Sequence, residues 1–508
     1  MINQRRDLIF CLLSVVMVGL YVFTADGGFP LDDSWIHQVY ARNLGQNFEW
    51  AFVPGEPSAA STSPLYTVVL SIGYGLGVPY QLWTHLLGTL ALTATAMLGA
   101  RMADRAAPDL RGIGWFVGLA LIGTWHLVWA AASGMETMLF AMFTLLLIDL
   151  TWREFEADVP AHALRRGAIF GAVAALAMTT RPEGLGLAGL CGLVMLLHVT
   201  ERRDYLLRWV MGAAVGFAVF ITPYLALNVG LAGSLLPNTA DAKFVQHAPI
   251  RDNVPYLERL WTMLLPIIVG GQILLLPGAL WFSWRRLRAA HPDYKALAYL
   301  LPLAWIIALL ALYAARLPAP YQHGRYVMPA LPALIVIGVI GTAYLVRMGR
   351  RSASGRVATR TLAIAAVVAF AYFAFAQGPR IYARDVQIID EEMVANAHWI
   401  RDNLDDVYLL AIHDIGAVGY FAPREIVDIA GLVSPEAIER IGDADAQWAY
   451  IEAQGADYLM AFPDQVPGGD VNDPRLCLAH ESDGTASLIA AGYKMTIYRI
   501  AWDGVCPS

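Results

Sequence analysis

Long apolar stretches separated by short polar segments recur along the first three quarters of the chain. Most of them have close to the ~20 residues that an α-helix needs to cross the hydrocarbon core of a bilayer. The pattern predicts eleven spans, at residues 8–25, 81–100, 112–131, 137–152, 166–180, 184–200, 209–229, 260–282, 296–315, 327–346 and 361–377. The first follows the basic start "MINQRR" and precedes no small-residue cleavage site, so it is interpreted as a retained anchor rather than a signal peptide.

One further apolar segment, "PLYTVVLSIGYGLG" at residues 64–77, is short and ends in three closely spaced glycines. Its 14 residues favour a re-entrant or interfacial segment over a span. If it does not cross, 20 Lys and Arg of residues 1–377 fall on one side of the membrane and 7 on the other. If it crosses, the positive-inside rule fails. The charge distribution therefore predicts a cytoplasmic N-terminus, an extracytoplasmic C-terminus and residues 64–77 on the outer face.

Composition agrees with a multi-span membrane protein. Of 508 residues, 57% are hydrophobic and 15% are charged, well below the roughly 25% charged residues of an ordinary soluble domain. The spacing of the four cysteines does not suggest metal binding. Only Cys477 and Cys506 are expected outside both membrane and cytoplasm, where oxidation is allowed, so a disulfide between them is predicted. A pair of buried free thiols remains the alternative.

The last quarter of the chain has a different character. Residues 378–508 hold 22 Asp and Glu against 8 Lys and Arg. An amphipathic helix at 387–404 is followed by short β-rich runs that alternate with helical stretches, which predicts a small α/β fold. No glycine-rich phosphate loop accompanies it, so no nucleotide site is predicted. The expected organisation is a membrane domain at 1–377 and an extracytoplasmic α/β domain at 378–508.

The first outer loop begins with "LDDSWIHQVYARNLGQ", which has two adjacent carboxylates at the start of a helix. Asp32 is suited to cap this helix, and Asp33 lies in the first turn, where negative charge is favoured by the helix dipole. Capping alone is therefore one explanation of the pair, and a catalytic role is the other. An apolar face suited to lying on the membrane surface follows at Ile36, Val39, Tyr40 and Leu44.

Other polar residues are expected at the same membrane face, in short outer loops. Together they would form a polar cavity at the span ends. They are Glu136 in "SGMET", Arg181 in "TRPEG", Asn238 and Lys243 in "LLPNTADAK", and His323 and Arg325 in "QHGRYVMP". Each alone has an ordinary explanation, because an arginine at a span end often snorkels to the interface and an isolated histidine is often a satisfied interface residue.

The order of these motifs resembles the GT-C membrane glycosyltransferases, which take a sugar from a polyprenyl-phosphate carrier at the outer membrane face. The similarity covers most of the chain and looks closest to bacterial members related to the mycobacterial arabinofuranosyltransferases. It implies a GT-C-like fold of about 11 spans in a bacterial plasma membrane, with a glycan, lipid or protein acceptor and no nucleic-acid partner. Acidic residues of the first outer loop serve as catalytic base in this family, and their matches here are Asp32 and Asp33.

Glycosyl transfer needs a base for the acceptor hydroxyl and cations for the departing phosphate. Asp32 is the leading candidate for the base, with Asp33 as its orienting neighbour or alternate. Arg325 is preferred for the phosphate because a planar fork binds its oxygens in pairs. The remaining substrate-binding candidates are Lys243, Arg181, Asn238, His323 and Glu136. No cofactor is certain; a divalent cation (Mg, Mn or Ca), if one is used, would be held by Asp32, Asp33 and Glu136.

Two other classes of function are weighed. A transporter or flippase of lipid-linked sugars should carry charges near the bilayer midplane and often internal repeats, whereas these spans are almost free of charge and no repeat is found. A non-catalytic anchor with a glycan-binding outer domain would not require the carboxylate pair. Both remain alternatives to transfer.

Overall fold

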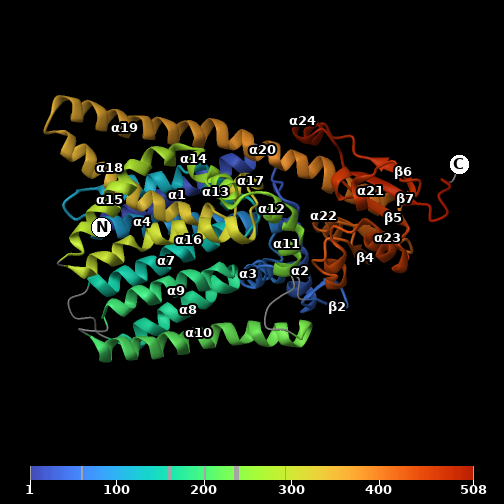
Figure 1. Ribbon diagram of the computed structural model, residues 1–508, viewed down its shortest axis with the longest axis horizontal. Helices are drawn as coiled ribbons and strands as arrows, with labels where there is room; N and C mark the ends of the chain where they lie inside the picture. The colour runs from blue at the N-terminus through green and yellow to red at the C-terminus, as the bar shows by residue number, and fades with distance from the viewer. Residues whose placement is uncertain are drawn as a thin grey trace.

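The protein is elongated, with a helical body at one end and a sheet-containing C-terminal region at the other (Figure 1). The computed structural model describes residues 2–58, 61–156, 162–198, 202–233, 239–291 and 293–506. The N-terminus lies in the helical body and the C-terminus at the opposite end of the long axis.

The helical body is built from the apolar stretches and the outer loops between them. Its helices and its one two-stranded sheet are α1 (Ile2–Phe23), α2 (Asp32–Asn47), β1 (Ala51–Val53), β2 (Glu56–Pro57), α3 (Pro64–Gly75), α4 (Tyr80–Ala106), α5 (Ile113–Ile122), α6 (Trp125–Ala132), α7 (Thr137–Glu156), α8 (Ala163–Thr180), α9 (Glu183–Met195), α10 (Arg203–Ala232), α11 (Thr239–Gln246), α12 (Ala248–Asn253), α13 (Tyr256–Met263), α14 (Leu265–Ile268), α15 (Leu276–Ala289), α16 (Leu301–Arg316), α17 (Tyr321–Gly324), α18 (Leu331–Gly349) and α19 (Ala353–Tyr372). Short 3₁₀ segments include η2 (Gly271–Leu275) and η4 (Met328–Ala330).

Among the described residues, six helices are long and apolar enough to cross a membrane, or eight if each of two bent helix pairs counts as one span. The bent pairs are α5 with α6, at 53°, and α13–α14 with η2–α15, at 93°. The predicted count of eleven is therefore not confirmed and stays a prediction. The segment at 64–77 forms the 12-residue helix α3, which is too short to cross a bilayer alone.

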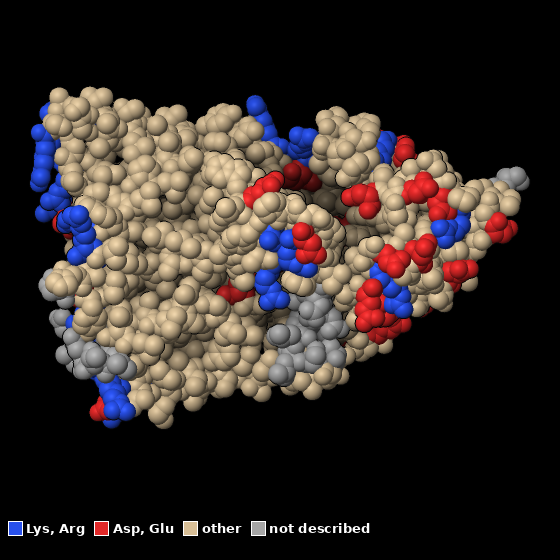
Figure 2. All heavy atoms as spheres, in the orientation of Figure 1, with Lys and Arg blue, Asp and Glu red and all other residues tan. Residues whose placement is uncertain are grey.

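Charge is distributed along the long axis as a membrane protein requires. On the face shown in Figure 2, Lys and Arg gather at the end far from the C-terminal region, and Asp and Glu gather over that region. The broad surface between them carries little charge. This uncharged belt and the apolar helices indicate an integral membrane protein.

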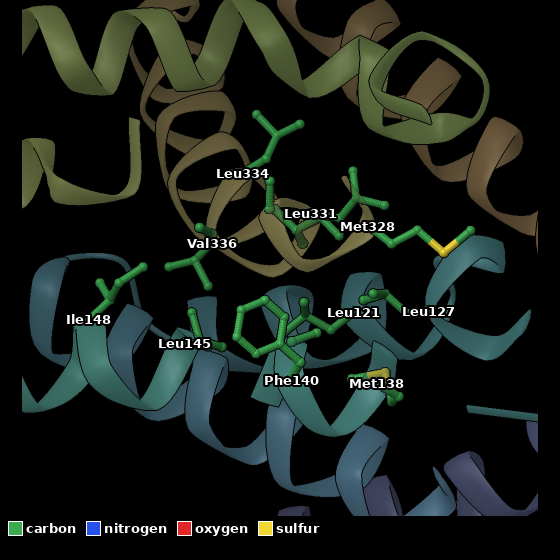
Figure 3. Packing of buried hydrophobic residues seen from close by; sticks show 14 of the residues in the cluster. Leu121, Leu127, Met138, Phe140, Leu145, Ile148, Met328, Leu331, Leu334 and Val336 are labelled. Atoms are coloured by element: carbon green, nitrogen blue, oxygen red, sulfur yellow. The ribbon is translucent and has the colours of Figure 1, made fainter. Parts of the chain in front are cut away.

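Close packing, rather than exclusion from water, holds helices together within lipid. Helices α8 and α10 approach so closely at Gly167 and Gly171 that a Cβ at either would lie 1.9 Å from a backbone oxygen of α10. In the centre of the body, side chains of α7 meet those at the start of α18 (Figure 3). Phe140 and Leu331 are fully buried there. This packing fixes the start of α18, directly after the loop that carries Arg325.

The C-terminal region contains a five-stranded mixed sheet in the order β4-β3-β5-β7-β6. Strands β4, β3 and β5 are parallel to one another, and β7 runs antiparallel to both of its neighbours, β5 and β6. Its elements are β3 (Leu410–Ile412), α22 (Gly416–Phe421), β4 (Ile426–Asp428), α23 (Ala444–Ala453), β5 (Tyr458–Ala461), β6 (Leu476–Glu481), α24 (Ala486–Ala491) and β7 (Thr496–Ile500). The predicted disulfide is confirmed: Cys477 on β6 is bonded to Cys506, with Cα atoms 5.5 Å apart.

The two regions are joined by a helix and by a shared core. A helical stretch from Ala353 to Asn403, which includes α20 (Gly378–Ile389) and α21 (Ala395–Asn403), runs through the predicted boundary at residue 378. The prediction that the apolar face of α2 lies on the membrane surface is wrong. Ile36, Val39 and Tyr40 are buried in one cluster with residues of the C-terminal region such as Val418, because that region offers them a protein surface.

Candidate active site

The sequence suggested that Asp32 caps its own helix, but in the structure it does not. The N-cap position of α2 is Leu31, which makes no side-chain capping bond. The Asp32 carboxylate instead accepts hydrogen bonds from the backbone N–H groups of Gly416, at 2.7 Å, and Ala417, at 2.8 Å. Asp32 therefore ties the first outer loop to the residues that follow strand β3.

This position changes the acid–base behaviour of Asp32. Its side chain is buried, and burial together with the nearby Asp414 carboxylate raises the pKa of Asp32 to about 8. Both carboxylate oxygens of Asp32 are buried and already engaged by the backbone N–H groups of Gly416 and Ala417.

Asp33 lies in a different environment, because it faces two cations of the helical body. Its Oδ2 pairs with the Arg325 guanidinium and lies 3.7 Å from Lys243 Nζ. Burial acts to raise the pKa of Asp33, but Lys243 and Arg325 outweigh it and hold the pKa well below its usual value. Asp33 is therefore ionised, and its side chain, 32% exposed, is open to a ligand.

Arg325 has hydrogen-bonding capacity that the described residues do not use. Its side chain is 3% exposed, and its Nη2 donates to Asp33 and to the Tyr326 hydroxyl, the latter at 3.1 Å. Within the described chain, its Nε and Nη1 are buried and have no hydrogen-bond partner. Unpaired buried donors are costly, and a phosphate oxygen would satisfy either N–H group through a charge-assisted hydrogen bond.

A second ion pair adjoins the first. Arg181 Nη1 lies 2.6 Å from Glu136 Oε1, and His37 Nε2 lies 3.3 Å from Glu136 Oε2. Arg181 and Arg325 each place their guanidinium carbon 4.9 Å from the centroid of the same ring, Tyr326. Tyr326 therefore joins the two ion pairs into one site.

Sequence reasoning gave no role to His37 or Tyr326. Both positions could have been found from the sequence. His37 lies one helical turn after Asp33 on α2, and Tyr326 follows Arg325 directly in the chain.

His323 contacts a different cluster. Its Nε2 lies 2.7 Å from Asp385 Oδ2, an oxygen that also accepts from Trp129 Nε1 at 2.9 Å. Gln322 and His323 have φ values of +53° and +57°, a left-handed conformation that is strained for residues with side chains. This turn directs His323 toward α20 and away from Asp33. Asn238 lies outside the described residues.

The predicted carboxylates do not form a metal site in this arrangement. Asp32 is engaged by two amides, Asp33 by two cations, and Glu136 by Arg181 and His37. No group of three or more His, Cys, Asp or Glu within the described ranges is placed to hold a metal ion. The donor set therefore does not fit a divalent cation, and we derive no step through one.

Two cavities, of about 310 and 680 Å³, lie apart from this site and share Asp109 and Arg347 in their walls. They open among arginines at the C-terminal ends of α15 and α18, and Asp33 lines neither of them. They take no part in the arrangement described above.

Comparisons with known proteins agree with this architecture. A family model described as a domain of unknown function (DUF8728) matches residues 380–501. A terminal β-(1→2)-arabinofuranosyltransferase of Mycobacterium tuberculosis is 27% identical over 338 residues, which cover 61% of this chain and 52% of the relative. The chain thus spans about half the length of that curated relative.

Two solved proteins share the fold over nearly the whole chain. ArnT from Cupriavidus metallidurans in the apo state superposes with a TM-score of 0.60 at 15% identity, covering 98% of each chain. The Archaeoglobus fulgidus oligosaccharyltransferase superposes with a TM-score of 0.58 at 12% identity, covering 98% of this chain and 73% of the other. The chain therefore shares the fold of these two proteins, a GT-C-like helical fold, as the resemblance implied. ArnT has also been solved bound to undecaprenyl phosphate, and that structure superposes with a TM-score of 0.58 at 16% identity, covering 98% of this chain and 99% of the other.

Proposed function

We propose that the protein transfers a sugar from a polyprenyl-phosphate donor to a hydroxyl group of an acceptor at the outer face of the membrane. The observation that carries this proposal is the buried Arg325, two of whose donor nitrogens have no partner among the described residues, next to Lys243 and an ionised Asp33. Support for the donor class comes from ArnT, which shares the fold and has been solved with undecaprenyl phosphate. Eleven spans, a cytoplasmic N-terminus and an extracytoplasmic region from residue 378 belong to the same proposal.

The transfer reaction requires a proton acceptor on one side of the site and positive charge on the other. The acceptor oxygen forms a bond to the anomeric carbon, the bond from that carbon to the phosphate oxygen breaks, and the hydroxyl proton passes to a carboxylate. The donor phosphodiester carries one negative charge and the departing polyprenyl phosphate gains a second, so charge grows where Arg325 and Lys243 lie. Cations fixed in a buried site stabilise this charge without reorganisation.

Asp33 fits the role of base better than Asp32. Asp33 is partly exposed and faces Lys243 and Arg325, whereas Asp32 is buried with both oxygens engaged by backbone N–H groups. A low pKa makes Asp33 a weak base in the free protein, but a donor phosphate that engages Arg325 would compete for that cation and raise the proton affinity of Asp33. Asp32 then serves to hold the C-terminal region against the site.

Transfer is tested with purified protein in detergent, supplied with polyprenyl-phosphate pentoses and hexoses and a mixture of glycan, lipid and peptide acceptors. The proposal expects release of polyprenyl phosphate and a glycosylated product with at least one donor. A flippase moves its substrate between leaflets and leaves the sugar–phosphate bond intact. Intact donor in every reaction, with transbilayer movement of the donor in proteoliposomes, would refute transfer.

A further inference from the structure

The C-terminal sheet has a switch in strand order between β3 and β5. The chain passes from β3 to β4 on one side and then crosses to β5 on the other side of β3. In open sheets with parallel strands, ligands bind at the carboxyl ends of the strands at such a switch point. Here β3 ends at Ile412 and β5 at Ala461.

A chain of polar side chains occupies this edge. His413 Nδ1 lies 3.2 Å from Asp414 Oδ1, and Gln465 Nε2 donates to Asp414 Oδ2 at 2.7 Å. The side chains of His413 and Asp414 are 24% and 23% exposed, so both are open to a ligand. Two aromatic rings, Phe462 directly after β5 and Tyr493, lie with their centroids 5.5 Å apart.

This edge faces the ion-pair site of the helical body. His413 Nε2 lies 3.2 Å from Gln246 Nε2 on α11, the helix that also carries Lys243 one turn earlier. From the other side, Asp32 holds Gly416 and Ala417 by their backbone N–H groups. Figure 2 shows the surface hollowed where the helical body meets the C-terminal region.

We propose that His413, Asp414 and Gln465 form the acceptor subsite and that the acceptor is a glycan whose sugar hydroxyls they bind. This inference rests on the proposed function and narrows its acceptor class. These groups are already hydrogen-bonded to one another, but each Asp414 oxygen can accept a second bond and the Gln465 amide can donate a second, as neighbouring sugar hydroxyls require. Aromatic rings beside a few convergent polar groups are typical of a small-molecule site. A glycan held here presents its terminal hydroxyl toward the side of α2 that carries Asp33.

The test measures binding of soluble tetrasaccharides of arabinose, galactose or mannose to the full-length protein without donor, by saturation-transfer NMR and calorimetry. The variants are Asp414→Asn and His413→Gln. The matched control is Asp405→Asn, an exposed carboxylate before the amino end of β3. At least one tetrasaccharide should bind the wild type, each site variant should weaken it by tenfold or more, and the control should bind as the wild type does.

Absence of binding to the wild type, or equal binding by all variants, would overturn the subsite. Thermal unfolding is measured for each variant to show that it is folded. If Asp414→Asn is not folded, the binding measured with His413→Gln decides the test. In transfer reactions the site variants should raise the acceptor KM and leave the donor KM unchanged. Glycan binding that depends on Asp414 without any sugar transfer would refute the proposed function alone, whereas transfer with an unchanged acceptor KM would refute the subsite alone.

Discussion

Replacing Arg325 with lysine keeps a positive charge in the site and removes the guanidinium fork. Arg325 is 3% exposed and pairs with Asp33 through Nη2, while Nε and Nη1 have no partner in the described chain. A lysine ammonium is a compact point charge and cannot place donors at the positions of Nε and Nη1 of a planar guanidinium. Arg325→Lys therefore separates the effect of geometry from the effect of charge.

The expected loss follows from the number of donors removed. Loss of one preorganised donor to a developing oxyanion costs about 10²–10³ in kcat, so we expect kcat to fall by about 10²-fold. The donor KM should change less, because the phosphate gains its second charge only as the sugar departs.

The assay is the initial rate of polyprenyl phosphate release by purified protein at saturating acceptor. The matched control is Arg251→Lys on α12, where the arginine lies against the Phe244 ring and 3.7 Å from Asp252, outside the ion-pair site. The control should retain activity within about twofold. If Arg325→Lys does the same, the phosphate does not depend on the fork and the assignment of Arg325 is refuted.

Three further predictions concern the C-terminal region and the topology. The raised pKa of Asp32, about 8, means that the folded protein keeps a proton that the unfolded chain releases; this stabilising contribution is complete below pH ~4 and is lost as pH rises to about 8. The midpoint of thermal unfolding should fall as pH rises through this range, and Asp32→Asn should make that fall smaller. An unchanged dependence of the midpoint on pH in the variant would contradict the assignment. Alkylation of unfolded, unreduced protein should leave Cys477 unmodified, and modification equal to that of the free cysteines Cys11 and Cys191 would show that the bridge is absent. A cysteine in place of Arg351 should resist impermeant reagents in sealed cells, and ready labelling would reject the proposed orientation.

Some of the residues expected at one membrane face lie together in the structure, but the sequence could not predict how they pair. Glu136, Arg181, Lys243 and Arg325 were expected on one membrane face from the order and charge of the loops, and the structure brings them together around Tyr326. The partner of Asp32 is the backbone at Gly416, 384 positions away. No local periodicity encodes such a contact, so the sequence offered only a helix cap or a catalytic base as roles for Asp32.

Other departures also come from tertiary structure. His323 is two residues from Arg325, yet two consecutive left-handed residues turn it toward Asp385. The apolar face of α2 has the pattern of a membrane-surface helix, and periodicity cannot tell a lipid surface from a protein surface. The span count is equally ambiguous from hydropathy, since bent pairs such as α5 and α6 and short helices such as α9 are as apolar as straight spans.

The most direct test of the central claim is a single-turnover measurement on Asp33→Asn with donor binding recorded in the same samples. Removing this carboxylate leaves Arg325 and Lys243 without their anionic partner, so the variant should bind the anionic donor as tightly as the wild type or more tightly. Loss of the base should slow polyprenyl phosphate release by about 10²–10⁴-fold. Tight donor binding with slow release is the predicted result, and a near-wild-type release rate would contradict the account.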